Sequence, residues 1–138
     1  MSSTLTSTQY EETRVSEELD IVSARVKAKA RAEALGFGYM DQTRIATAVS
    51  ELARNALQFG GGGTVKVCQV VIEGKRGIEI VVEDKGPGIQ NLELALKGGH
   101  STSGGLGLGL SGSRRLMDEF NIETAPNKGT TVTVRKWL

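Results

Sequence analysis

Three segments in the middle of the chain combine residue types that can do chemistry, and they follow one another in a definite order. The first places Glu51 four residues before Asn55, the second follows Asp84 with two alternate glycines, and the third is a glycine-rich run over residues 104–110. Half of the chain's 18 glycines lie between residues 86 and 112. Glycine loses much backbone entropy on folding, so this density indicates a main chain that bends sharply or lies against a ligand. Together the three segments predict an ATP site.

The first segment suits metal and proton chemistry. A spacing of four puts Glu51 and Asn55 on one face of a helix, one turn apart. The amide oxygen of Asn55 is a neutral ligand of the kind that a hard cation such as Mg²⁺ accepts. The carboxylate of Glu51 can orient or deprotonate a hydroxyl group or a water molecule. Taken alone, such a pair is more often a solvated helix surface, so its weight comes from the other two segments.

The second segment suits recognition of a base. In the strand predicted over residues 78–84, alternation puts Asp84 on the apolar face, where a carboxylate needs a partner. A carboxylate only accepts hydrogen bonds, which matches the exocyclic amine of adenine. Gly86 and Gly88 would let the ring approach the main chain. The alternative is a Pro-Gly turn that closes the strand, and the apolar position of Asp84 argues against it.

The third segment suits phosphate binding, because unpaired N–H groups and the helix dipole favour anions where a helix begins. Residues 107–112 also match the G-x-G-x-x-G pattern of dinucleotide-binding folds. That pattern requires a preceding strand and an acidic residue about 20 positions later, and the chain offers neither. A P-loop is excluded as well, since no Gly-Lys-Ser/Thr follows.

The spacing of apolar residues predicts the order βααββαββ. Strands are expected at residues 13–19, 64–73, 78–84, 120–124 and 130–137, and helices at residues 20–35, 41–59 and 105–117, with Asp20 as the first N-cap. The loop over residues 89–103 is a candidate lid, too long for a simple connection. This order predicts an α+β fold, a two-layer α/β sandwich with helices on one face of a mixed β-sheet. Residues 1–12 are expected to form a disordered leader and residues 13–138 a single domain.

Composition narrows the classes of function. The 138 residues include 17 basic and 16 acidic side chains, so nothing points to nucleic acid. The apolar runs are too short for a membrane span, and the N-terminus has no signal core, so we expect a cytoplasmic protein. The single Cys68 lies in a valine-rich strand and is expected to be a buried structural thiol.

In order and spacing, the three segments resemble the N, G1 and G2 boxes of the GHKL ATP-binding superfamily, whose Bergerat fold layers helices over a mixed sheet. Within it, residues 50–56 are similar to the N box of the anti-sigma-factor-type serine/threonine kinases. The resemblance extends over roughly residues 14–137. Further similarity to the switch kinases of this group lies at residues 20–25, 36–38, 41–45, 101–107, 115–120 and 136–137.

The resemblance implies roles for individual residues. Asn55 would hold Mg²⁺, Asp84 would bind adenine, Gly86 and Gly88 would line the base, and Glu51 would act as the base or as the hydroxyl-orienting group. ATP and Mg²⁺ are thus the expected cofactors. The glycine-rich segment implies that further nucleotide-binding residues are Ser103, Gly104, Gly105, Leu106, Gly107, Leu108 and Gly109.

The resemblance also implies a function as an ATP-dependent protein serine/threonine kinase that switches partners. It would phosphorylate a STAS-domain protein of the stressosome and, once released, activate a PP2C-type phosphatase in stress sigma-factor regulation. An alternative is a nucleotide-gated, anti-sigma-like binding protein with little transferase activity. The catalytic module of a histidine kinase is a weaker alternative, because the only histidine, His100, lies in the candidate lid, where a surface position is expected.

Overall fold

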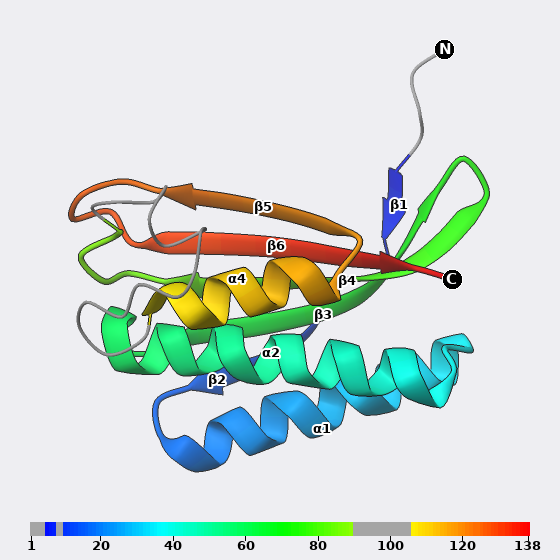
Figure 1. Ribbon diagram of the computed structural model, residues 1–138, viewed down its shortest axis with the longest axis horizontal. Coiled ribbons are helices and arrows are strands. Elements are labelled where there is room, and N and C mark those ends of the chain that lie inside the picture. Colours follow the sequence, from blue (N-terminus) through cyan, green and yellow to red (C-terminus); the bar gives the residue numbers. More distant parts are fainter. Residues whose placement is uncertain (1–4, 8–9, 90–105) are drawn as a thin grey trace.

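A computed structural model describes residues 5–7, 10–89 and 106–138, with side chains described for residues 10–89 and 110–138. The described helices cover one face of a β-sheet, and the core lies between the two layers (Figure 1). The two-layer α+β architecture is therefore confirmed. The elements are β1 (Leu5–Ser7), β2 (Glu11–Val15), α1 (Glu18–Leu35), α2 (Tyr39–Gly60), β3 (Gly63–Ile72), β4 (Lys75–Asp84), α4 (Leu106–Leu116), β5 (Glu119–Thr124) and β6 (Thr130–Trp137).

The sheet has the strand order β1-β3-β4-β6-β5, and β2 also pairs with β3. Every described pairing is antiparallel, whereas the sequence predicted a mixed sheet. The reason is the position of β6. The connection through α4 returns the chain so that β5 runs in the same direction as β4, but β6 lies between these two strands and pairs with both. The parallel relation therefore never becomes a hydrogen-bonded pair.

The N-terminal region differs from the expectation of a disordered leader over residues 1–12. Within it, β1 and the first residues of β2 pair with β3. Edge pairing needs only backbone N–H and C=O groups, so a polar sequence can supply it. Tyr10 adds a side-chain anchor, since its hydroxyl donates a hydrogen bond to Glu79 Oε1 at 2.6 Å.

The start of α1 also corrects the sequence analysis. Glu17 is the N-cap, and Asp20 is the third helical residue of a capping box. The Oδ2 atom of Asp20 accepts hydrogen bonds from the backbone N–H groups of Ser16 and Glu17 at 2.9 and 3.0 Å. These bonds lower the pKa of Asp20. An acidic residue near a helix start fits either position, so sequence alone did not separate them.

The helices predicted over residues 20–35 and 41–59 each bury one apolar face. The buried residues of α1 are Ile21, Ala24, Ala28 and Ala32, and those of α2 include Ile45, Ala48, Val49, Leu52 and Ala56. Helix α2 ends at Gly61, whose φ of 73° is left-handed. Cys68 is fully buried in β3, and burial raises the pKa of its thiol, as expected of a structural cysteine. None of the described helices is both long and apolar enough to cross a membrane.

The β3–β4 hairpin turns earlier than predicted. The turn was expected over residues 74–77, but only Glu73 and Gly74 separate the strands, with φ angles of 51° and 81°. Two residues with positive φ make the tight turn that a right-twisted hairpin prefers. Gly77 lies within β4 instead, where a Cβ atom would come within 2.7 Å of the Trp137 ring.

Candidate nucleotide-binding site

The second half of α2, the end of β4 and the start of α4 enclose a narrow cavity of about 40 Å³. One water needs about 10–15 Å³ of such volume, so the cavity as it stands has room for only a few waters. Mostly apolar walls with a few polar groups are typical of a ligand site. The lining residues are Leu52, Asn55, Ala56, Phe59, Gly60, Val82, Asp84, Gly88, Ile89, Leu110, Thr130 and Val132.

Asn55 supplies a polar group that the described protein leaves without a partner. Its Nδ2 atom is buried and makes no hydrogen bond in the described part of the chain. An unsatisfied buried amide of this kind costs roughly 1–3 kcal/mol, so a native protein keeps one where a ligand completes it. The same amide carries the oxygen that a hard cation would accept. The side chain thus fits both a nucleotide phosphate region and its Mg²⁺ ion.

Asp84 lies at the end of β4, on the face that points towards the helices. Ile78, Ile80 and Val82 precede it on that face and are buried, as the alternation predicted. The Oδ1 atom of Asp84 accepts a hydrogen bond from the Gly86 N–H at 2.9 Å. Burial raises the pKa of this carboxyl, and the backbone N–H groups of Gly86 and Thr130 act in the opposite direction.

Gly60 gives Asp84 its room, and this residue was missed by the sequence analysis. A Cβ atom on Gly60 would lie 2.3 Å from Asp84 Cγ and 2.7 Å from Asp84 Oδ1. A Cβ atom on Gly86 would in turn lie 2.5 Å from Gly60 Cα. The run of four glycines over residues 60–63, which begins at the last residue of α2, is typical of a helix end. It did not indicate that the first of them packs against the carboxylate of the second segment.

The loop after Asp84 is held by the turn between β5 and β6. Gly88 has a φ of 81°, and a Cβ atom there would lie 2.2 Å from Ala125 O. The Ile89 N–H donates to Thr124 Oγ1 at 2.9 Å, and the Asn127 N–H donates to Pro87 O at 2.8 Å. The glycine therefore has a steric role against another loop besides the predicted role beside a base. Residues 87–89 and 124–127 are far apart in the sequence, so no local pattern of residue types predicts that these two loops are in contact.

The remaining predicted site residues either do not line the cavity or lie outside the described residues. Glu51 lies one turn before Asn55 on α2, outside the cavity wall, with its side chain 40 % exposed and 3.5 Å from the Arg54 guanidinium. Ser103, Gly104 and Gly105 lie outside the described residues, as does His100. The other four glycine-segment residues, Leu106, Gly107, Leu108 and Gly109, form the first turn of α4.

The glycine segment therefore does open a helix, and Leu110, its last residue, lines the cavity together with Asn55 and Asp84. The structure thus brings together one polar residue from each of the first two segments and the helix that begins in the third. Most other residues of the wall, among them Thr130 and Val132 of β6, were not predicted as site residues. Their burial follows from packing across the two layers, which only the fold defines.

Comparison with known proteins identifies the family to which this chain belongs. Residues 40–138 match the family described as histidine kinase-, DNA gyrase B-, and HSP90-like ATPase. The chain belongs to this ATPase family. The three segments all lie inside the matched range, and so does the whole cavity wall.

Similarity to individual proteins indicates which kind of ATPase-family protein this chain is. The chain is 48 % identical over 125 residues to the serine/threonine-protein kinase RsbT of Bacillus subtilis (strain 168), covering 91 % of this chain and 94 % of that protein. It is 32 % identical over 119 residues to an anti-sigma F factor of Clostridium kluyveri, covering 82 % of each. An anti-sigma F factor of Anoxybacillus flavithermus is 37 % identical over 103 residues, covering 70 % of this chain and 69 % of that protein. These similarities confirm the predicted superfamily and the predicted enzyme class, a protein serine/threonine kinase.

Proposed function

We propose that this ATPase-family chain transfers the γ-phosphoryl group of ATP to a serine or threonine hydroxyl of a partner protein. The observation that carries the proposal is the cavity in which Asp84 and the unpartnered amide of Asn55 line the same wall. One is an acceptor-only group on an apolar face, and the other is a neutral amide whose Nδ2 atom has no hydrogen-bond partner among the described residues. This pair of environments suits the amine of a purine at one end and a phosphate with its cation at the other.

Each predicted residue has a role in this proposal. Asp84 accepts the adenine amine, Gly86 and Gly88 leave space beside the ring, and Asn55 offers its amide oxygen to Mg²⁺. The ion would neutralise phosphate charge in the bound nucleotide. The backbone N–H groups at the start of α4, together with residues 103–105, are proposed to receive the phosphates.

Glu51 is proposed to act on the incoming hydroxyl. It lies one helical turn before Asn55, and its half-exposed carboxylate is accessible to a partner protein. In the transfer, the bond from the γ-phosphorus to the bridging oxygen breaks, and a bond to the hydroxyl oxygen forms. Glu51 would accept the hydroxyl proton or hold that hydroxyl in line. The exposed position supports this role, because the acceptor must come from another chain.

We further propose that the partners are a STAS-domain protein of the stressosome, as substrate, and a PP2C-type phosphatase, which the released kinase activates in stress sigma-factor regulation. The support is the extent of the similarity to the switch kinase RsbT, which spans nearly the full length of both chains. Phosphorylation would add negative charge to the substrate at the interface and so promote release.

Binding and transfer by matched variants test the proposal. Asp84→Asn should weaken ATP binding in calorimetry on the order of tenfold to a hundredfold, because it replaces an acceptor oxygen by a donor facing the adenine amine. Glu83→Gln is the matched control, since Glu83 is the preceding residue of β4 and pairs with Lys66 at 3.0 Å on the other face of the sheet. Unchanged affinity in Asp84→Asn would contradict the site assignment.

A second candidate function is a nucleotide-gated binding protein with little transferase activity. The anti-sigma F factors among the relatives favour it. Incubation of the wild-type chain with γ-labelled ATP and a STAS-domain protein separates the two functions. Label on the STAS-domain protein supports the kinase, whereas ATP-dependent binding without label supports the gated binding protein.

A further inference from the structure

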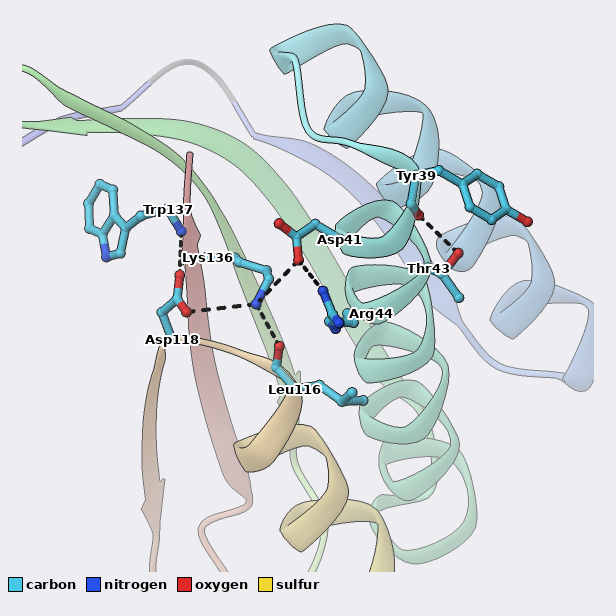
Figure 2. Close-up of polar contacts among 8 residues, drawn as sticks. All are labelled: Tyr39, Asp41, Thr43, Arg44, Leu116, Asp118, Lys136 and Trp137. Carbon is cyan, nitrogen blue, oxygen red and sulfur yellow. Dashed lines mark hydrogen bonds and ion pairs between the residues drawn. The ribbon is translucent and has the colours of Figure 1, made fainter.

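A buried lysine joins three elements at the end of the molecule opposite the cavity. Lys136 lies near the end of β6, and its side chain is only 10 % exposed. Its ammonium group donates a hydrogen bond to the Leu116 carbonyl at 2.9 Å and lies 3.7 Å from Asp118 Oδ1 and 3.8 Å from Asp41 Oδ1. Figure 2 shows the amine between these three oxygens. They belong to the end of α4, the approach to β5 and the first turn of α2.

The partners of Lys136 are themselves held in place. Asp41 Oδ1 also accepts from Arg44 at 2.8 Å, and Asp118 Oδ2 accepts the Trp137 backbone N–H at 2.8 Å. The Leu116 carbonyl is the last of α4, and such carbonyls have no partner within the helix. A cation at that end also interacts favourably with the helix dipole. The cluster is therefore a preorganised clamp, and we call Lys136, Leu116, Asp118 and Asp41 the lysine clamp.

The lysine clamp unites three stretches to which the proposed ATP chemistry gives no role. Residues 41–45, 115–120 and 136–137 belong to the similarity found in the sequence, yet none of them lines the cavity. The structure brings them to one point. Asn55 lies fourteen positions after Asp41 along α2, about 21 Å at 1.5 Å per residue. The clamp therefore acts on the nucleotide only through the helices.

The sequence of helix α4 gives the helix little intrinsic stability, so its position depends on contacts with other elements. Three of its 11 residues are glycine, and each glycine inside a helix is less favourable than alanine by about 1 kcal/mol. Glycines also contribute no side chain to hold the axis of the helix. Among the described side chains, the buried ones are Leu110, Ser111 and Ser113 on the helix and Met117 just after it, and Leu116 is partly buried against the core. The end at Leu116 is fixed by a charged donor, and α4 packs directly against α2.

We propose that Lys136 is a positioning residue for nucleotide binding. By tying the end of α4 to the start of α2, it sets the glycine segment on α4 against Asn55 on α2, some 15 Å from the clamp along α4. This inference rests on the proposed function, since it assumes that both helices contact ATP. Lys136 lies outside the cavity wall, so its proposed effect is on the alignment of the two halves of the site.

The test separates alignment from stability by comparing KM with kcat. In Lys136→Met, KM for ATP should rise roughly tenfold, because small misplacements of binding groups are costly, while kcat at saturating ATP stays within about twofold. Lys136→Arg keeps the charge and a donor and should restore most of the affinity. A lysine with only a structural role would lower the folded fraction, and so the apparent kcat, at an unchanged KM.

Ile21→Val is the control for stability, since Ile21 is buried in α1 away from α4 and the clamp. It should leave KM for ATP unchanged. An unchanged KM in Lys136→Met, or an equal rise in Ile21→Val, overturns the proposal. If Lys136→Met does not fold, Asp118→Asn is used, because its side chain is 45 % exposed and its loss is mild. A smaller rise in KM then supports the clamp, and an unchanged KM overturns it.

The outcome is distinguishable from failure of the proposed function. A wild-type chain that binds no ATP in calorimetry refutes the function itself. A wild-type chain that binds ATP, with affinity lost in Asp84→Asn and kept in Lys136→Met, refutes only the role of Lys136.

Discussion

The sharpest consequence of the site geometry is that a single methyl group on Gly60 should disable it. In Gly60→Ala the new Cβ atom would lie 2.3 Å from Asp84 Cγ and 2.5 Å from Asp84 Cβ. Carbon atoms in contact sit about 3.5–4.0 Å apart, so one partner must move by more than about 1 Å. The Asp84 backbone cannot retreat, because it is paired with Gly63 on one side and Thr130 on the other.

The expected magnitudes follow from that contact. Overpacking costs about 1–3 kcal/mol, which exceeds the few tenths to 1 kcal/mol that alanine gains over glycine in a helix. The variant should therefore unfold more easily in urea. Displacing the Asp84 carboxylate should also remove the proposed hydrogen bond to the adenine amine, and a hydrogen bond to a charged acceptor is worth about 1.5–3 kcal/mol. ATP affinity should fall on the order of tenfold to a hundredfold.

Calorimetric titration with ATP and urea unfolding measure both effects, with Gly112→Ala as the matched control. A Cβ atom on Gly112 meets nothing within 4 Å, and the residue lies inside α4. That control should gain about 0.5–1 kcal/mol in the free energy of unfolding and keep its ATP affinity. If Gly60→Ala bound ATP as tightly as the wild type and unfolded at the same urea concentration, the close packing of Gly60 on Asp84 would not govern the site.

Three further predictions concern protonation, chemistry and partners. Because burial raises the pKa of Asp84, the folded chain keeps this proton to higher pH than the unfolded chain does. The free energy of unfolding should therefore fall as pH rises from the ordinary value of 3.8 towards the raised pKa, and Asp84→Asn, measured by urea unfolding across that window, should lack this fall. Glu51→Gln should keep ATP affinity and reduce phosphoryl transfer by roughly a hundredfold, with Glu33→Gln on the exposed side of α1 as control; transfer at the wild-type rate would remove Glu51 from the chemistry. In competition binding, the STAS-domain protein and the PP2C-type phosphatase should exclude each other, since one specific interface covers about 800 Å² of a small domain; a stable ternary complex would contradict this.

Much of the fold could be predicted because its signals are local. Alternation along residues 78–84 and the helical stripe from Ile45 to Ala56 depend only on neighbours a few positions away, and both were confirmed. The antiparallel pairing of β6 with β4 could not be read in this way. It depends on which strand pairs with the free edge of β4. The two strands are 46 or more positions apart, and the periodicity of each strand does not indicate its partner. The prediction of Asp20 as the N-cap of α1 was wrong for another reason. Glu17 and Asp20 occupy complementary positions of one capping box, and both positions favour an acidic residue at this end of a helix.

The sequence by itself determined the chemical parts of the site: an amide and a carboxylate one turn apart on a helix, a carboxylate at a strand end, and a glycine run that opens a helix. These are properties of residue type and short spacing. Only the tertiary structure decided that Asn55 and Asp84 share one cavity while Glu51 stays outside its wall. It also decided that Gly60 packs on Asp84 and that Lys136 ties α4 to α2. The physical reason is that close packing and buried charge pairing act between atoms in contact, and contact across the two layers is unrelated to distance along the chain.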